Sequence, residues 1–230
     1  MKLALFDLDH TLLPIDSADT WSYYLVREAG LDTDEYSRKI RHFAESYKAG
    51  RFDIEGYLAF QMDLLARFPR PQLERWRDDF VNIHVAPHVR TEATALLARH
   101  RADGYVLALV TGTQAFLSRA IADLFGIEHL LAVTPEEVDG KFTGRYVGTH
   151  TYQEGKVRAV IAFLLARGTT LADCEDSIFY SDSINDLPLL EAVKHPVVTN
   201  GDARLRAIGA QRGWPVLDLF DLVPGGSHVA

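Results

Sequence analysis

The chain has 230 residues, of which 47% are apolar and 24% charged, with a formal net charge of −8. This composition is ordinary for a globular protein with a sizeable core, and its acidity argues against non-specific binding of nucleic-acid phosphates, which needs clustered Lys and Arg. The lone Cys174 excludes an internal disulfide and a multi-cysteine metal site, which suits a reducing compartment.

The first predicted element is a short apolar strand at residues 2–6, which we interpret as buried on both faces of a parallel sheet. Asp7, Asp9 and Thr11 follow it directly, at the strand end where α/β sheets bind ligands. The strand period points both carboxylates the same way, toward a shared cation or phosphoryl group. The two carboxylates also interrupt any signal-peptide pattern, and we predict a cytoplasmic protein with no membrane span.

Residues 16–84 have a different character, with apolar residues at helical spacing and no convincing strand. Helix-start signals recur at Asp16, Asp32 and Asp53. We therefore expect about four helices here.

Helices and strands alternate after Pro87. Helices are predicted at 92–102, 114–125, 154–167, 187–193 and 202–208, and strands at 105–110, 130–133, 178–180 and 196–198. Hairpin turns are predicted at 138–141 and 142–145, and the tail at 224–230 is expected to fray. The alternation predicts an α/β fold, a doubly wound parallel sheet. Its core domain comprises residues 1–15 and 88–230, and residues 16–87 form an inserted helical cap domain.

Polar clusters follow other predicted strands at the same edge of the sheet. Thr111 and Gly112 offer a hydroxyl and backbone amides to an anion, although Thr111 could equally be a helix N-cap. Lys156 falls near a helix start, where the dipole disfavours a cation, although most such lysines are simply solvated. Asp182, Asn185 and Asp186 could complete an oxygen-rich Mg²⁺ site with Asp7, or form a capped turn.

Four motifs follow one another along the chain: Asp-x-Asp-x-Thr, then Thr-Gly, then Lys, then Asp-x-x-Asn-Asp. This ordered set resembles that of the haloacid dehalogenase-like hydrolase superfamily. The inserted helical segment resembles the members that carry a helical cap. The run Asn-Asp-Leu-Pro-Leu-Leu at 185–190 is similar to the phosphoserine phosphatase branch.

The resemblance implies that Asp7 is a nucleophile that forms an aspartyl-phosphate, and that Asp9 is the general acid and base. It also implies that Thr111, the Gly112 amide and Lys156 bind the phosphoryl group. The implied ligands of Mg²⁺ are Asp7, the main-chain carbonyl of Asp9, and Asp182. Asn185 and Asp186 would support the metal shell or Lys156.

The cap is expected to carry substrate specificity, because it closes over the phosphate. The candidate substrate contacts are Asp16, Trp21, Tyr24 and Arg51, although Asp16 could equally be a plain helix N-cap and Arg51 could simply be solvated. Phosphoserine phosphatases carry a Glu at the place of Asp16 and a cap Arg after a Phe, and this chain lacks an Arg soon after Phe52. The candidate substrates are therefore phosphoserine, histidinol phosphate and other small phosphorylated metabolites.

These observations predict a Mg²⁺-dependent phosphomonoester hydrolase that acts as a monomer or homodimer. Two alternatives remain at this point. One is a phosphomutase or phosphotransferase, which would use the same aspartyl-phosphate. The other is a non-catalytic protein that has the same fold and binds a phosphorylated ligand.

Overall fold

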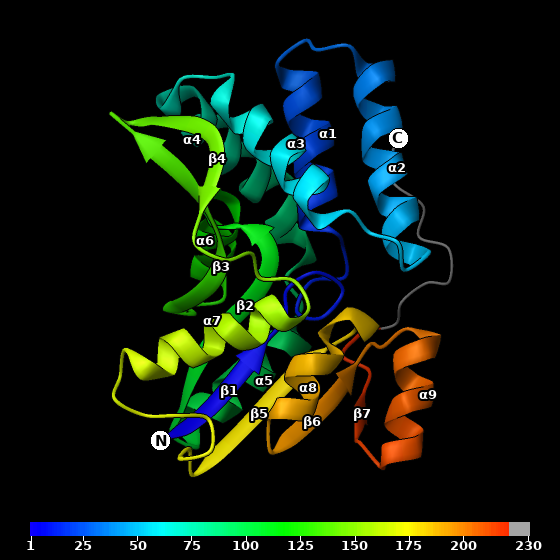
Figure 1. The fold of residues 1–230 in the computed structure, drawn as a ribbon, viewed down its shortest axis with the longest axis vertical. Helices are drawn as coiled ribbons and strands as arrows, with labels where there is room; N and C mark the ends of the chain where they lie inside the picture. Colours follow the sequence, from blue (N-terminus) through cyan, green and yellow to red (C-terminus); the bar gives the residue numbers. More distant parts are fainter. Residues whose placement is uncertain (221–230) are drawn as a thin grey trace.

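The computed structural model describes residues 1–220, so the fraying predicted for 224–230 lies outside the described residues. Within residues 1–220 the chain forms one seven-stranded sheet in the order β4-β3-β2-β1-β5-β6-β7 (Figure 1). The strands are β1 (Lys2–Phe6), β2 (Tyr105–Gln114), β3 (His129–Val138), β4 (Lys141–Val147), β5 (Asp176–Ser181), β6 (His195–Thr199) and β7 (Val216–Leu217). All neighbours pair in parallel except β3 and β4, so the predicted doubly wound parallel sheet is confirmed.

The helices cover both faces of this sheet. They are α1 (Ser17–Glu28), α2 (Thr33–Lys48), α3 (Ile54–Ala66), α4 (Arg70–Phe80), α5 (Thr91–Ala102), α6 (Ala115–Leu124), α7 (Glu154–Leu165), α8 (Leu187–Ala192) and α9 (Ala203–Arg212). Because side chains alternate along a strand, Ala4 and Phe6 pack into one cluster with α5 and α6, whereas Leu3 and Leu5 pack with α7, α8 and α9. Burying β1 on both faces explains its continuous apolar sequence.

Four helices, α1 to α4, lie between β1 and α5 in the chain, as the sequence predicts. The side chains of Asp16, Asp32 and Asp53 cap α1, α2 and α3 by accepting backbone N–H groups. These helices stand beyond the carboxyl end of the central strands, above β1 and β2 in Figure 1. The division into a core and a separate cap at residues 16–87 stays a prediction.

The sequence reasoning was wrong at one turn and missed two strands, β4 and β7. Residues 142–145 do not turn, because β4 runs through them to Val147, and only Asp139 and Gly140 turn the hairpin. Gly144 has a φ of 85°, which lets the backbone bend within the strand. Strand β7 has only two residues, too few for a sequence pattern. Within residues 1–220, no helix has the length and apolar character needed to cross a membrane.

Candidate active site

The polar clusters converge because β1 lies between β2 and β5 in parallel register. Phe6 pairs with Leu109 on β2 and with Tyr180 on β5, so the three strands end at the same edge. Asp7 continues β1, and its N–H donates to the carbonyl of Tyr180 at 3.0 Å. This pairing places the Asp7 carboxylate beside the loop that contains Asp182 and Asp186.

A buried ammonium group joins two of these carboxylates. The Lys156 Nζ lies 2.6 Å from Asp7 Oδ1 and 2.7 Å from Asp186 Oδ2. All three side chains are nearly inaccessible to solvent. Burial alone would lower the pKa of Lys156, but Asp186 and Asp7 hold that pKa above its usual value. The ammonium therefore stays charged at neutral pH.

The hydroxyl of Thr11 links Asp7 to Asp182. Its Oγ1 lies 3.2 Å from Asp7 Oδ2 and 3.2 Å from Asp182 Oδ1, and it accepts the Asp182 N–H at 3.0 Å. Burial, with the charges of Asp7 and Asp186, raises the pKa of Asp182 well above its usual value. Burial also raises the pKa of Asp186 to about 6, against the opposing effect of Lys156. More negative charge is gathered here than one ammonium balances, so the site favours a further cation.

Asp9 is held on the other side of Asp7 by two donors. Its Oδ1 accepts the N–H of Ser17 at 2.7 Å, and its Oδ2 accepts the Thr113 hydroxyl at 2.8 Å. Burial and the charge of Asp16 raise the pKa of Asp9 to about 6, although these hydrogen bonds lower it. A carboxyl group with such a pKa exchanges protons readily near neutral pH.

The turn before α7 gives Lys156 its position. Gln153 has a φ of 50°, and a Cβ on Gly155 would lie 2.0 Å from the backbone carbonyl oxygen of His150. Residue 155 must therefore be Gly for α7 to begin here. Lys156 follows in the first turn of α7, where it reaches Asp7 and Asp186.

Thr111 and Gly112 lie near the end of β2, close to the turn before α7. The Thr151 hydroxyl donates to the Thr111 carbonyl, and the Thr111 hydroxyl accepts the Thr113 N–H at 3.1 Å. The helix α6 begins three residues after Gly112, with Gln114 as its N-cap. Thr111 is therefore not the helix cap that the sequence left as an alternative.

Aromatic residues connect the inserted helices to the loop after β5. The Tyr47 hydroxyl, at the end of α2, lies 2.7 Å from the Ser183 hydroxyl. Tyr152 donates to Asn185 Oδ1 at 3.0 Å, and its ring centroid lies 5.4 Å from that of Phe52. These contacts bring α2 and the segment after it over the carboxylate cluster.

The structure does not bring the predicted substrate contacts together as it does the predicted catalytic residues. Asp16 caps α1, and one of its oxygens accepts the Asp19 N–H at 2.8 Å. Trp21 and Tyr24 are buried against each other and against Phe80, within the hydrophobic core. Arg51 is exposed on the loop after α2.

The sequence reasoning assigned no role to several hydroxyl groups that contact the carboxylates. Thr113 donates to Asp9, Thr11 contacts Asp7 and Asp182, and Ser181 donates to Asp186 at 2.6 Å. The only available signal was that each residue lies within or beside a predicted motif. Ser and Thr are too common at turns for this signal to identify them.

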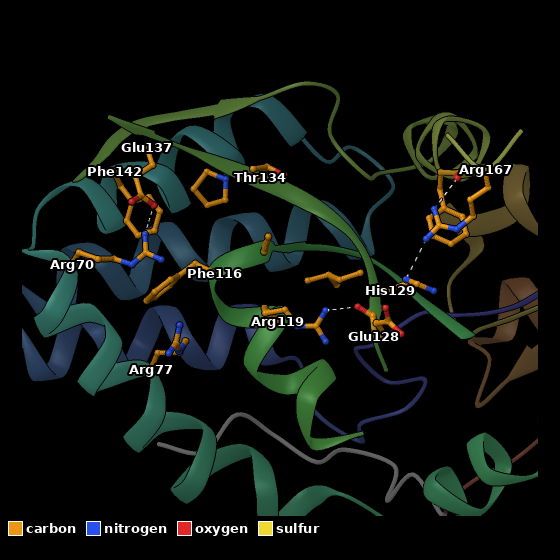
Figure 2. Close-up of a pocket in the computed structure, with 14 residues that line it drawn as sticks. Arg70, Arg77, Phe116, Arg119, Glu128, His129, Thr134, Glu137, Phe142 and Arg167 are labelled. Carbon is orange, nitrogen blue, oxygen red and sulfur yellow. Dashed lines mark hydrogen bonds and ion pairs between the residues drawn. The ribbon is translucent and has the colours of Figure 1, made fainter. Parts of the chain in front are cut away.

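A separate hollow of about 570 Å³ lies between α4, α6, α7 and the β3–β4 hairpin. Figure 2 shows the side chains that line it. Its lining includes the arginines Arg70, Arg77, Arg119 and Arg167, but none of the residues of the carboxylate cluster. Each of these arginines already bonds a carboxylate or a backbone carbonyl. This hollow is therefore distinct from the candidate active site.

The chain is similar to known hydrolases along most of its length. The model of the haloacid dehalogenase-like hydrolase family matches residues 4–191. A histidinol-phosphatase of Neisseria meningitidis is 36% identical over 94% of this chain and 98% of its own length. A probable phosphatase of Mycobacterium tuberculosis is 32% identical over 99% of this chain and 80% of its own length.

Solved structures support the same grouping. A crystal structure from Bordetella pertussis, of a protein with unknown function, has a TM-score of 0.90 at 42% identity, covering 95% of this chain and 99% of that one. A structure of phosphoserine phosphatase as a phospho-aspartyl intermediate analogue has a TM-score of 0.66 at 21% identity, covering 95% of this chain and 93% of that one. At this identity the similarity shows a shared fold. The chain belongs to the haloacid dehalogenase-like hydrolase family. Its enzyme class is that of the phosphatases.

Proposed function

We propose that this protein hydrolyses a small phosphomonoester with the help of Mg²⁺, through an aspartyl-phosphate on Asp7. The observation that carries the proposal is the buried Lys156 ammonium, held between Asp7 and Asp186 at the carboxyl end of the central strands. A phosphomonoester is a dianion, so a carboxylate that attacks it must overcome like-charge repulsion. A fixed ammonium offsets this repulsion and stabilises the charge of the transition state.

In the first step a carboxylate oxygen of Asp7 attacks phosphorus, and the bond from phosphorus to the ester oxygen breaks. Protonated Asp9 gives its proton to the leaving alkoxide and becomes a carboxylate. In the second step Asp9 takes a proton from a water molecule, whose oxygen attacks phosphorus and releases Asp7 and inorganic phosphate. The pKa of about 6 suits Asp9 to both roles, because each protonation state is accessible near neutral pH.

The donor chemistry of the site fits Mg²⁺. Asp7 and Asp182 supply carboxylate oxygens on either side of Thr11, and the backbone carbonyl of Asp9 is the third ligand that we propose. Two carboxylates suit Mg²⁺, which often binds one or two of them together with water and substrate phosphate. When bound, Mg²⁺ neutralises phosphoryl charge.

We propose histidinol phosphate as the first substrate to test, because the histidinol-phosphatase relative matches nearly the whole chain. Asp16 is the N-cap of α1, directly before Ser17, whose N–H donates to Asp9, and it offers a negative charge to a substrate amine. We further propose that the protein is cytoplasmic and acts as a monomer or homodimer.

The test is phosphate release from histidinol phosphate, phosphoserine and other phosphorylated metabolites, with Mg²⁺ and with a chelator. We expect Mg²⁺-dependent release and a rise in the melting temperature Tm when Mg²⁺ is added without substrate. A second alcohol offered in excess separates hydrolysis from phosphoryl transfer, because a phosphotransferase would form a new ester. Turnover that is indifferent to the chelator would contradict the proposal.

The Gly112→Ala variant tests the phosphoryl-binding part of the proposal. A Cβ on Gly112 would meet the Thr151 carbonyl oxygen at 3.7 Å, an ordinary contact, so we expect the fold to tolerate it. The methyl group would instead hinder approach of the phosphoryl group to the backbone amide. We expect KM to rise about tenfold, equivalent to about 1.4 kcal/mol. Unchanged values for KM and for inhibition by inorganic phosphate would contradict this prediction.

A further inference from the structure

The hollow between α4, α6, α7 and the β3–β4 hairpin gathers positive charge in a chain that is acidic overall. Four arginines and two carboxylates line it: Arg70, Arg77, Arg119 and Arg167, with Glu128 and Glu137 (Figure 2). The whole chain has a formal net charge of −8. A hollow lined mainly by one sign of charge concentrates ligands of the opposite sign. The lining therefore favours an anion.

Two of these arginines have a structural role. Arg70, at the start of α4, forms ion pairs with Glu74 on the same helix and with Glu137 on β3. Arg119 pairs with Asp123 one turn further along α6 and donates to backbone carbonyls of the loop that follows this helix. Carboxylates of the chain itself balance both charges, so neither arginine needs a ligand.

Arg77 is held at the hollow without using all of its donors. Within residues 1–220 its only ion pair is with Asp78, the next residue of α4, which is exposed and does not line the hollow. Exposed pairs of this kind contribute little. The Arg77 Cζ lies 4.8 Å from the ring centroid of Phe116, a contact that fixes the guanidinium through its face. Nε and Nη2 contact Asp78, and Nη1 makes no hydrogen bond in the described part of the chain, so it can donate to a ligand.

Arg167, which follows α7, pairs with no carboxylate among residues 1–220. Its Nη1 donates to the Phe163 carbonyl at 3.1 Å, and its Nη2 lies 3.4 Å from His129 Nδ1. Its Cζ lies 3.7 Å from the ring centroid of Phe163, so the guanidinium is stacked in place. Neither hydrogen-bond partner is an acid. The positive charge of Arg167 is therefore available to an anionic ligand.

The two available cations are well separated, and the hollow also offers apolar surface. Figure 2 shows Arg77 and Arg167 toward opposite sides of the hollow. Phe116, Leu130 and Phe142 contribute apolar side chains to the same lining. The volume of about 570 Å³ is typical of a pocket for a small molecule. This combination matches a molecule that carries an acidic group at each end and an apolar middle.

We propose that the hollow is a second binding site, which takes an elongated organic dianion with an apolar middle. One acidic end binds Arg77, the other binds Arg167, and the middle contacts the apolar lining. The bound ligand bridges α4, in the inserted helical segment, and the end of α7, the helix whose first turn carries Lys156. The inference does not rest on the proposed phosphatase function, because the hollow shares no residue with the carboxylate cluster.

Straight-chain α,ω-dicarboxylates from succinate to sebacate test the inference, by calorimetric titration of the whole protein in low-salt buffer without Mg²⁺. The monomethyl ester of each diacid is the matched ligand, because it keeps the chain length and loses one charge. We expect affinity to rise up to the diacid that spans the two arginines. That diacid should bind about tenfold more tightly than its monomethyl ester, equivalent to about 1.4 kcal/mol. Added NaCl should weaken binding, because salt screens exposed charges.

Arg77→Gln and Arg167→Gln each remove one end of the proposed site. In both variants the diacid should bind no more tightly than its monomethyl ester. Arg167 is exposed, so its variant tests the site even if Arg77→Gln lowers the Tm. Arg75→Gln is the matched control, because Arg75 is an exposed arginine of α4 that does not line the hollow, and it should keep the wild-type preference.

Three results would overturn the inference: equal binding of diacids and monomethyl esters by wild type, a preference that persists in Arg77→Gln and Arg167→Gln, or an equal loss of preference in Arg75→Gln. Failure of the proposed phosphatase function is a separate result. It would leave these titrations unchanged, since they contain neither Mg²⁺ nor a phosphate ester.

Discussion

Replacing Asp7 by Asn is expected to lower kcat by about 10⁴-fold or more while leaving the protein folded. The amide nitrogen of Asn cannot act as the nucleophile, and its neutral side chain cannot form the aspartyl-phosphate. The fold should persist because Lys156 keeps Asp186 as a partner, and because loss of one charge relieves repulsion with Asp182. Phosphate release under single-turnover conditions and the Tm measure the two effects separately.

Asp139→Asn is a suitable control for this experiment. Asp139 is an exposed residue of the β3–β4 turn with a φ of 50°, a conformation that Asn tolerates well. Its rate and Tm should match those of wild type. If Asp7→Asn retained more than about a tenth of the wild-type rate, a loss of only about 1.4 kcal/mol in transition-state stabilisation, Asp7 would not be the nucleophile.

Replacing Lys156 by Met is expected to remove activity and also to destabilise the protein by about 3–5 kcal/mol. Met fills most of the volume of Lys but leaves Asp7 and Asp186 buried without their shared ammonium. For a chain of this size the Tm should fall by roughly 2–4 °C for each kcal/mol. Denaturant unfolding at neutral pH measures the change in free energy directly.

The stability loss in Lys156→Met should depend on pH in a definite direction. The folded-state pKa of Asp186 is raised to about 6, so below about pH 6 this carboxyl group is protonated and no longer needs the ammonium. Loss of the ammonium raises the pKa of Asp186 further in the variant, so the difference in stability between variant and wild type should shrink as pH falls from the alkaline range toward about 6. A difference that stayed constant from pH 9 to pH 6 would contradict the electrostatic explanation.

Lys39→Met provides the comparison for this second prediction. Lys39 forms an exposed ion pair with Glu35 one turn earlier on α2, and pairs of this kind contribute about 0.3–0.5 kcal/mol. A stability loss in Lys156→Met no larger than that in Lys39→Met would show that the buried ammonium does not hold the carboxylate cluster together.

The predicted catalytic set was accessible from the sequence because it follows from a topological rule. Asp7, Lys156 and Asp182 each adjoin the end of a predicted apolar strand or the start of a predicted helix, and parallel strands bring such ends to one edge. The structure brings these side chains within bonding distance of one another or of Thr11. Their catalytic roles stay a proposal until the variants are measured.

The predicted substrate contacts are not gathered at the site in the same way. Nearness to a motif in the sequence says little about which face of a helix is buried. Trp21 and Tyr24 adjoin the first motif in sequence, yet they pack against Phe80 in the hydrophobic core.

The sequence by itself determined the order of the chemical groups along the chain: an apolar strand ending in carboxylates, an inserted helical segment, and later hydroxyl, ammonium and carboxylate groups at strand ends or helix starts. These features are local patterns, and parallel pairing carries them to one place. Only the tertiary structure decided that Thr113 donates to Asp9 and that Tyr47 reaches Ser183. Burial and hydrogen bonding between distant segments depend on how the helices pack on the sheet, and no local pattern records that packing.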